Sequence, residues 1–106
     1  MPFLALEAAH DAVRLLREPL AVIARRDPPL ADQLRRASQN AVLNLAESQR
    51  RRGADRANRI RIGAGEAGEA RAALDLAVSS GYLAGRPPAW AALDRVLALT
   101  WPWVRP

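Results

Sequence analysis

Cysteine and lysine are both absent from this chain of 106 residues, and each absence narrows the chemistry open to it. Without cysteine the chain forms no disulfide, thiolate metal site or cysteine nucleophile, a pattern that fits a reducing compartment. Without lysine, the net charge of +5 comes from arginine alone. Aromatic residues are also scarce, whereas alanine is abundant. Because strands favour aromatic and β-branched residues and alanine is the best helix former, the composition favours helices.

The sequence also lacks the long apolar runs that membranes require. No uncharged apolar segment approaches the roughly 18 residues of a membrane span. The first residues, 1–7, carry no basic segment and reach a charge at once, so no signal peptide is expected. The length is typical of one compact domain. We therefore expect a single domain over residues 1–106 that is soluble and cytoplasmic.

Apolar residues recur at alternating spacings of three and four, which predicts helices at about residues 3–25, 29–51, 55–79 and 88–100. Their stripes consist of Leu6, Ala9, Val13, Leu16, Leu20, Ile23; Leu30, Leu34, Ala37, Ala41, Leu45; Ala57, Ile60, Ala64, Ala67, Leu74, Val78; and Trp90, Leu93, Val96, Leu97, Trp101. Trp90 and Trp101 are thus expected in the core or packed at an end of the bundle. Because the connections are short, neighbouring helices should run in opposite directions. The predicted fold is an all-α, antiparallel up-down four-helix bundle.

Prolines, glycines and capping residues place the helix ends. Pro19 predicts a kink around residues 16–18, and Pro102 is expected to stop the last helix. Asp27 and Asp55 are the expected N-caps of the second and third helices. Gly53 is expected to adopt a left-handed conformation where the second helix ends. Three further glycines inside the third helix call for a compensating reason such as close helix contact, and these are Gly63, Gly65 and Gly68.

The positive charge is concentrated in the middle of the chain. Between residues 35 and 61, eight arginines stand against two acids, whereas outside that window eight arginines meet nine acids. Guanidinium groups match the fork geometry of phosphates and bind them with strong salt dependence. The sequence therefore indicates a nucleic-acid-binding surface around the turn between the second and third helices, with a solvated basic face as the alternative. The candidates are Arg35, Arg36, Arg50, Arg51, Arg52, Arg56, Arg59 and Arg61. Adjacent helix positions diverge by about 100°, so the eight cannot share one face.

A polar stripe runs beside the apolar one on the second predicted helix. Asn40, Asn44 and Glu47 lie on it, and Glu47 can pair with Arg51 four residues on. These residues either form interhelical hydrogen bonds that fix register or lie at a subunit interface. Trp103 falls beyond the predicted end of the last helix and is either a core residue or an interface anchor.

Residues suited to catalysis or metal binding are few. His10 shares one helix turn with Glu7 and Asp11, but three ligands on one helix rarely enclose a metal, so a solvated face is expected. Glu66 and Glu69 share a helix face without the histidine that carboxylate metal sites in bundles use, and salt bridges to arginine are expected instead. No phosphate loop or nucleophile motif is present. We expect no enzymatic activity, no cofactor and no metal.

Several segments resemble a known family. Residues 30–37, read as L-A-D-Q-L-R-R-A, followed by N-L-A-E at 44–47, resemble the 23S rRNA intervening-sequence protein family of four-helix bundles. That family carries Q-L-R-R-A followed by N-I-A-E-G. The likeness continues through I-G-A-G at 62–65 with Glu69, and through S-G-Y-L at 80–83. Together these segments cover about half the chain in the family's order. Positions that depart from the pattern are Asn40, Ser48 and Glu66.

The resemblance implies an assembly and partners. Members of this family look like homopentamers and are similar to the accessory proteins of diversity-generating retroelements, which engage a reverse transcriptase and nucleic acid. By this likeness we expect a homo-oligomer, a pentamer, that binds RNA or DNA, with Gly65 and Glu69 at structural or interface positions. The alternative is a protein-interaction scaffold, in which the arginines and Trp103 meet an acidic partner protein.

Overall fold

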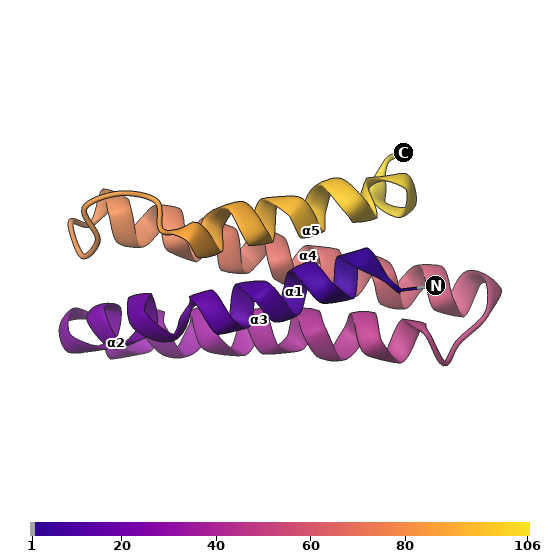
Figure 1. The fold of residues 1–106 in the computed structure, drawn as a ribbon, viewed down its shortest axis with the longest axis horizontal. Coiled ribbons are helices and arrows are strands. Elements are labelled where there is room, and N and C mark those ends of the chain that lie inside the picture. Colours follow the sequence, from indigo (N-terminus) through magenta and orange to yellow (C-terminus); the bar gives the residue numbers. More distant parts are fainter. Residues whose placement is uncertain (1) are drawn as a thin grey trace.

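The computed structural model describes residues 2–106, and these form five helices with no strand among them. The helices are α1 (Leu4–Leu15), α2 (Arg17–Arg26), α3 (Pro28–Ser48), α4 (Gly53–Ser79) and α5 (Pro88–Val104). Figure 1 shows α1 and α2 following one another end to end, with the longer helices lying alongside them. The molecule is elongated and measures 43 × 22 × 22 Å. The all-α class predicted from composition and periodicity is confirmed.

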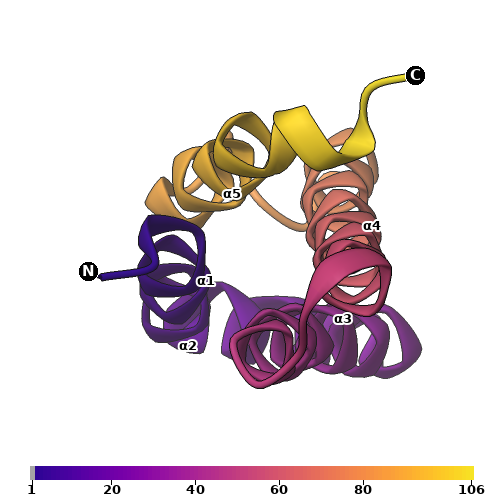
Figure 2. The ribbon, with the colours of Figure 1, turned by 90° about the vertical axis from the view of Figure 1, so that its right-hand side faces the viewer.

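Seen down the long axis, the helices surround a common centre (Figure 2). The rod made by α1 and α2 lies beside α3, α3 beside α4 and α4 beside α5, and α5 returns to contact α1. Alanine supplies more than half of the buried apolar residues, so the helix axes can approach closely. The largest fully buried side chains between them are Leu16, Ile23, Leu34, Leu45, Ile60, Leu74, Leu93 and Val96. No helix among residues 2–106 combines the length and apolarity that crossing a membrane requires.

The first predicted helix is broken at Leu16. Its N–H lies 2.9 Å from the carbonyl oxygen of Ala12 and 3.3 Å from that of Val13, so the regular pattern of hydrogen bonds ends there. Pro19 lies in the first turn of α2, where a missing N–H leaves no helical bond unmade. The predicted kink is confirmed, and it divides the helix in two.

Asp27 connects two segments that are distant in the sequence, the start of α3 and the connection between α4 and α5. One carboxylate oxygen accepts a hydrogen bond from the N–H of Leu30 at 3.1 Å, which caps α3 as predicted. The other oxygen accepts one from the hydroxyl of Tyr82 at 3.2 Å, in the segment after α4. The guanidinium of Arg26 lies 5.4 Å from the centre of the Tyr82 ring. This single carboxylate therefore fastens the connection before α5 to the start of α3.

The connection between α3 and α4 differs from the prediction. Helix α3 ends at Ser48, about one turn early, and α4 begins at Gly53, two residues before Asp55. The predicted capping role of Asp55 is wrong, because its carboxylate instead pairs with Arg51 at 3.0 Å. Gly53 has φ +56°, the left-handed conformation predicted for it.

Helix α5 continues past Pro102, contrary to the prediction that this proline stops it. The helix runs to Val104, and the N–H of Arg105 still bonds to the carbonyl of Trp101 at 3.0 Å. An interior proline removes one N–H from the helix and its ring crowds the preceding turn, but the residues after Pro102 still make helical hydrogen bonds. Continuation places Trp103 on the buried face, where it packs half-buried against the core.

Trp101 is more exposed than predicted. It follows the fully buried Thr100 by one residue, and one residue turns a helix by about 100° away from the core. Its side chain is 56% exposed, so the core position expected from the stripe is wrong. The predicted apolar stripe of this helix therefore wrongly includes Trp101.

The three glycines within α4 have different surroundings. A Cβ at Gly63 would lie 2.9 Å from Cγ of the fully buried Leu45, so α3 and α4 approach closely there, as predicted. A Cβ at Gly68 would meet Leu97 at an ordinary 3.8 Å, and one at Gly65 would meet nothing within 4 Å. Close packing therefore explains Gly63 and leaves Gly65 unexplained.

Candidate functional site

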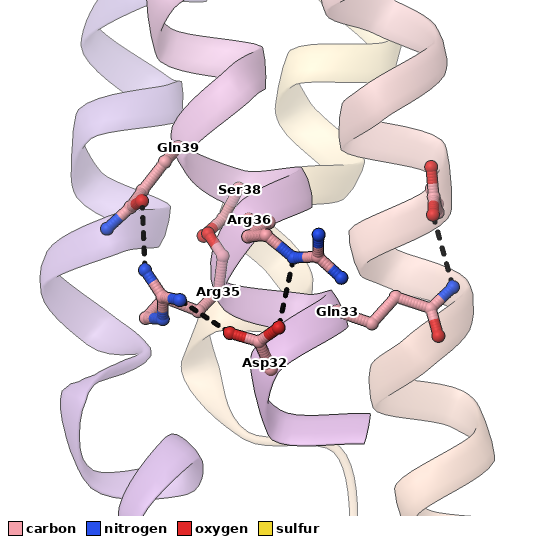
Figure 3. Close-up of polar contacts among 7 residues, drawn as sticks. Asp32, Gln33, Arg35, Arg36, Ser38 and Gln39 are labelled. Carbon is pink, nitrogen blue, oxygen red and sulfur yellow. Dashed lines mark hydrogen bonds and ion pairs between the residues drawn. The ribbon is translucent and has the colours of Figure 1, made fainter. Parts of the chain in front are cut away.

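Two of the eight predicted arginines lie far from the others. Arg35 and Arg36 both bond to Asp32 in the first half of α3 (Figure 3), the latter at 3.1 Å. The hydrogen bond from Arg35 holds the pKa of Asp32 below its ordinary value. Between Arg36 and Ser48 the helix rises by about 18 Å. The prediction that all eight gather around the turn after α3 is therefore wrong for this pair, whose charges are also partly compensated.

The other six lie around the connection between α3 and α4, and the structure adds a seventh. Nε of Arg61 donates to the backbone carbonyl of Trp103 at 2.8 Å, which holds the last turn of α5 against α4. Arg105 follows Trp103 by two residues and therefore lies near Arg61, towards the end of the molecule where α4 begins. Sequence reasoning missed it, because its only signal was a lone arginine after a helix assumed to stop at Pro102.

We call residues 47–61 together with 101–105 the basic end. It holds seven arginines against Glu47 and Asp55, whereas the rest of the chain holds nine arginines and nine acids. Helix α1 starts near this end and contributes one more acid, Glu7 in its first turn. The body of the molecule is therefore close to neutral, and most of the net charge of +5 resides at one end of a long rod.

Arg51 and Arg59, like Arg61, have hydrogen-bond partners within the chain. Arg51 lies between Glu47, at 2.9 Å, and Asp55, at 3.0 Å, and both carboxylates raise its pKa. The pairing of Glu47 with Arg51 four residues on was predicted and is confirmed. Arg59 donates to the amide oxygen of Asn44 at 3.3 Å, a neutral partner that leaves its charge uncompensated. Only Arg51 is neutralised by carboxylates.

Of the seven arginines of the basic end, Arg51 alone has an ion pair with a carboxylate of residues 2–106. Arg50, Arg52 and Arg56 are all exposed, and Arg56 only approaches the Phe3 ring, with 5.9 Å from its guanidinium carbon to the ring centre. Arg61 is bound to a neutral carbonyl through Nε alone. These planar forks are available to oxyanions, which they bind in a bidentate manner.

The predicted polar stripe links α3 to α4. Asn44 donates to the backbone carbonyl of Asn40 at 2.9 Å and accepts from Arg59, so one of its two contacts crosses between helices. Glu69 accepts a hydrogen bond from Gln33 at 3.1 Å, a second crossing contact that the sequence did not reveal. Burial, and then the neighbouring Glu69, raise the pKa of Glu66. Register between α3 and α4 is thus fixed by polar contacts on top of alanine packing.

The residues considered for metal binding or catalysis do not form an enclosed site. Glu7, His10 and Asp11 are all exposed on α1, where Asp11 bonds to Arg14. Within residues 2–106 no group of three or more histidine, aspartate or glutamate side chains lies close enough to hold a metal ion.

No protein-family model, curated protein or solved structure matches this chain.

Proposed function

We propose that this chain is a non-enzymatic, nucleic-acid-binding, antiparallel up-down four-helix bundle. In it α1 and α2 together form the first rod, and α3, α4 and α5 form the other three. The ring of neighbours in Figure 2 and the short connections between rods support this arrangement.

One observation carries the proposed binding: most of the net charge lies at the basic end. Arg50, Arg52 and Arg56 have no carboxylate partner within residues 2–106, so their guanidinium groups need not break an ion pair to meet a phosphate. Nucleic-acid phosphates bind such groups and release condensed counterions. A near-neutral body restricts this attraction to one end.

The family resemblance supports the rest of the proposal. The likeness of residues 30–37, 44–47, 62–65 and 80–83 to 23S rRNA intervening-sequence proteins supports a cytoplasmic homopentamer, with RNA or DNA and a reverse transcriptase as partners. A ring of five subunits would bring five basic ends together. Each end could then contribute modest affinity, and the assembly would bind through all of them at once.

Salt-dependent binding tests the proposed contact with phosphates. We expect RNA, single-stranded DNA or duplex DNA to bind at low salt, with affinity falling steeply as salt rises. Replacing Arg50, Arg52 and Arg56 with alanine, the basic-end triple variant, should weaken binding and reduce the slope of log K against log salt by about two to three. Anisotropy of labelled strands across a salt series measures both quantities.

The matched control removes the same charge from the body. Arg17, Arg25 and Arg95 are exposed and have no ion pair within residues 2–106, and their replacement with alanine gives the body triple variant. This variant should bind almost as the original chain does. Equal losses in both variants, or no binding of any strand at low salt, would contradict the proposal.

Light scattering tests the assembly separately. A pentamer has five times the chain mass of 11.6 kDa, and a monomer at working concentration would contradict this part of the proposal. Nucleic-acid binding and subunit number can fail independently of each other.

A second candidate is a scaffold for an acidic partner protein. It is favoured by the apolar side chains of Trp101 and Val104, which are 56% and 45% exposed within the basic end. Exposed tryptophan is a common anchor in protein interfaces. Co-purification of one stoichiometric protein that persists after nuclease treatment would support the scaffold over the nucleic-acid binder.

A further inference from the structure

An open groove of about 360 Å³ lies between α4 and α5, next to the basic end. Trp101 and Val104 line it at one end, and the salt bridge between Arg71 and Asp94, at 2.6 Å, lies at the other. Leu97 contributes to its apolar wall. The groove therefore runs from the neutral body towards the arginines, and its most exposed aromatic side chain lies at the charged side.

The face of α4 that meets α5 carries two glycines. Arg61, Gly65 and Gly68 share this face, since residues at i, i+4 and i+7 lie one above another on a helix. Arg61 contacts the carbonyl of Trp103, and Gly68 lies against Leu97, so both ends of the face meet α5. Between them a Cβ at Gly65 would meet open space. Packing therefore does not require this glycine.

The exposure of Trp101 is unusual for so large an apolar side chain. Trp103, only two residues away, packs against the core, whereas Trp101 is left 56% exposed. Exposed indole rings next to arginines are the combination with which proteins bind unpaired nucleotides, since the ring stacks on a base and the cations hold phosphates. A duplex offers phosphates but hides the faces of its bases.

We propose that Trp101 stacks on an unpaired base of a single-stranded polynucleotide whose phosphates lie on the basic end. The proposal rests on the nucleic-acid binding proposed above and narrows its substrate to strands with unpaired bases. Arg105 follows Trp101 by four residues, and Arg61 bonds to the carbonyl of Trp103, two residues from the ring, through Nε alone, so the other side-chain nitrogens of Arg61 are free for a phosphate. The open groove that Trp101 lines leaves room for the nucleotide beside the ring.

The test compares three probes with the full-length protein at low salt. These are a fluorescein-labelled single strand, supplied as oligouridine and as oligothymidine, a matched duplex, and an abasic strand of equal length. Trp101→Ala should weaken binding of the base-carrying single strands by about tenfold and leave the duplex and abasic strand within about twofold. Trp101→Phe should retain most of the affinity and lose the quenching of tryptophan emission by oligouridine. The RNA and DNA arms show whether the sugar matters.

A matched control and a second readout keep the inference separate from the proposed function. The control is Leu76→Ala. Leu76 lies on α4 and its apolar side chain is 54% exposed, similar to Trp101, so its removal should change none of these affinities. Unchanged single-strand affinity in Trp101→Ala, or equal affinity of the original chain for abasic and base-carrying strands, would overturn the stacking while leaving phosphate binding intact. A change of subunit number in Trp101→Ala without loss of strand affinity would assign this surface to a second copy and overturn it as well. Loss of all binding in the original chain would overturn both proposals.

Discussion

At the scale of single residues, the glycines of α4 differ in what a methyl group would meet. At Gly65 the added Cβ meets open space, so Gly65→Ala should gain the helix preference of alanine and stabilise the protein by about 0.5–1 kcal/mol. At Gly63 it would approach Leu45 Cγ at 2.9 Å, and Gly63→Ala should destabilise by about 1–2 kcal/mol. Urea unfolding measures both, and the two variants are each other's control. Effects of the same sign would contradict the packing described for α3 and α4.

Glu66 makes stability depend on pH. Burial raises its pKa, so the folded state favours the protonated acid and ionisation costs stability. That cost is absent below the ordinary pKa of 4.5, appears as pH rises through the raised value and persists at neutral pH. Glu66→Gln should therefore raise the melting temperature at about pH 7 and change it little below about pH 4. The exposed Glu7→Gln is the control, and a rise confined to acid pH would contradict the burial of Glu66.

At the scale of helices, Asp27 couples the cap of α3 to the segment before α5. Asp27→Ala should destabilise the protein by about 1–2 kcal/mol through loss of the cap, whereas Tyr82→Phe removes only the second contact and should cost less. Urea unfolding compares them. If Tyr82→Phe proved as costly as Asp27→Ala, the cap would not be the larger contribution.

The only tyrosine of the chain provides an independent readout of this junction. The hydrogen bond to Asp27, and then burial, raise the pKa of Tyr82 above its ordinary 10.0. The stability that the bond provides is thus present below that value and lost as pH rises through the raised pKa. Ultraviolet titration should show the phenol ionising at lower pH in Asp27→Ala than in the original chain. An unchanged titration curve would contradict the contact.

Helix positions were largely predictable from the sequence, and helix ends were less so. The spacing of Leu34, Ala41 and Leu45 already indicates the buried face of α3, because periodicity reports a whole helix at once. Where a helix ends depends on the effect of one or two residues, and that effect varies with their surroundings. Pro19 breaks the first helix whereas Pro102 leaves α5 intact, since the latter is followed by Trp103, which gains contact with the core by continuing the helix. The sequence alone carries no measure of that gain.

At the scale of the whole molecule, the charge excess was visible in the sequence but its boundary was not. Arg35 and Arg36 are near the cluster in sequence, yet the rise of α3 carries them away from it. Arg105 is distant in sequence, yet the return of α5 brings it to the basic end. Which charges lie together is decided by the packing of separate helices, and no local pattern reports that.

Mutual repulsion among seven arginines makes stability respond to anions. Sulfate or phosphate ions should raise the melting temperature by screening this repulsion, beyond their general stabilising effect on folded proteins. The basic-end triple variant should respond less than the original chain, and the body triple variant should respond equally. Thermal unfolding at matched ionic strengths of chloride and sulfate measures the difference. Identical responses of both variants would show that the arginines do not repel one another appreciably.

A rod with its charge at one tip has a preferred orientation in an electric field. The molecule is 43 Å long and 22 Å across, so a line of phosphates exerts a torque that turns the charged tip towards it. If phosphates bind the basic end, the long axis of each bound molecule would point away from the strand, and each molecule would cover a length of strand about equal to the width of the rod. Their neutral sides would then face one another, and the far tips, which carry the junction of Asp27 and Tyr82, would remain free to meet other molecules.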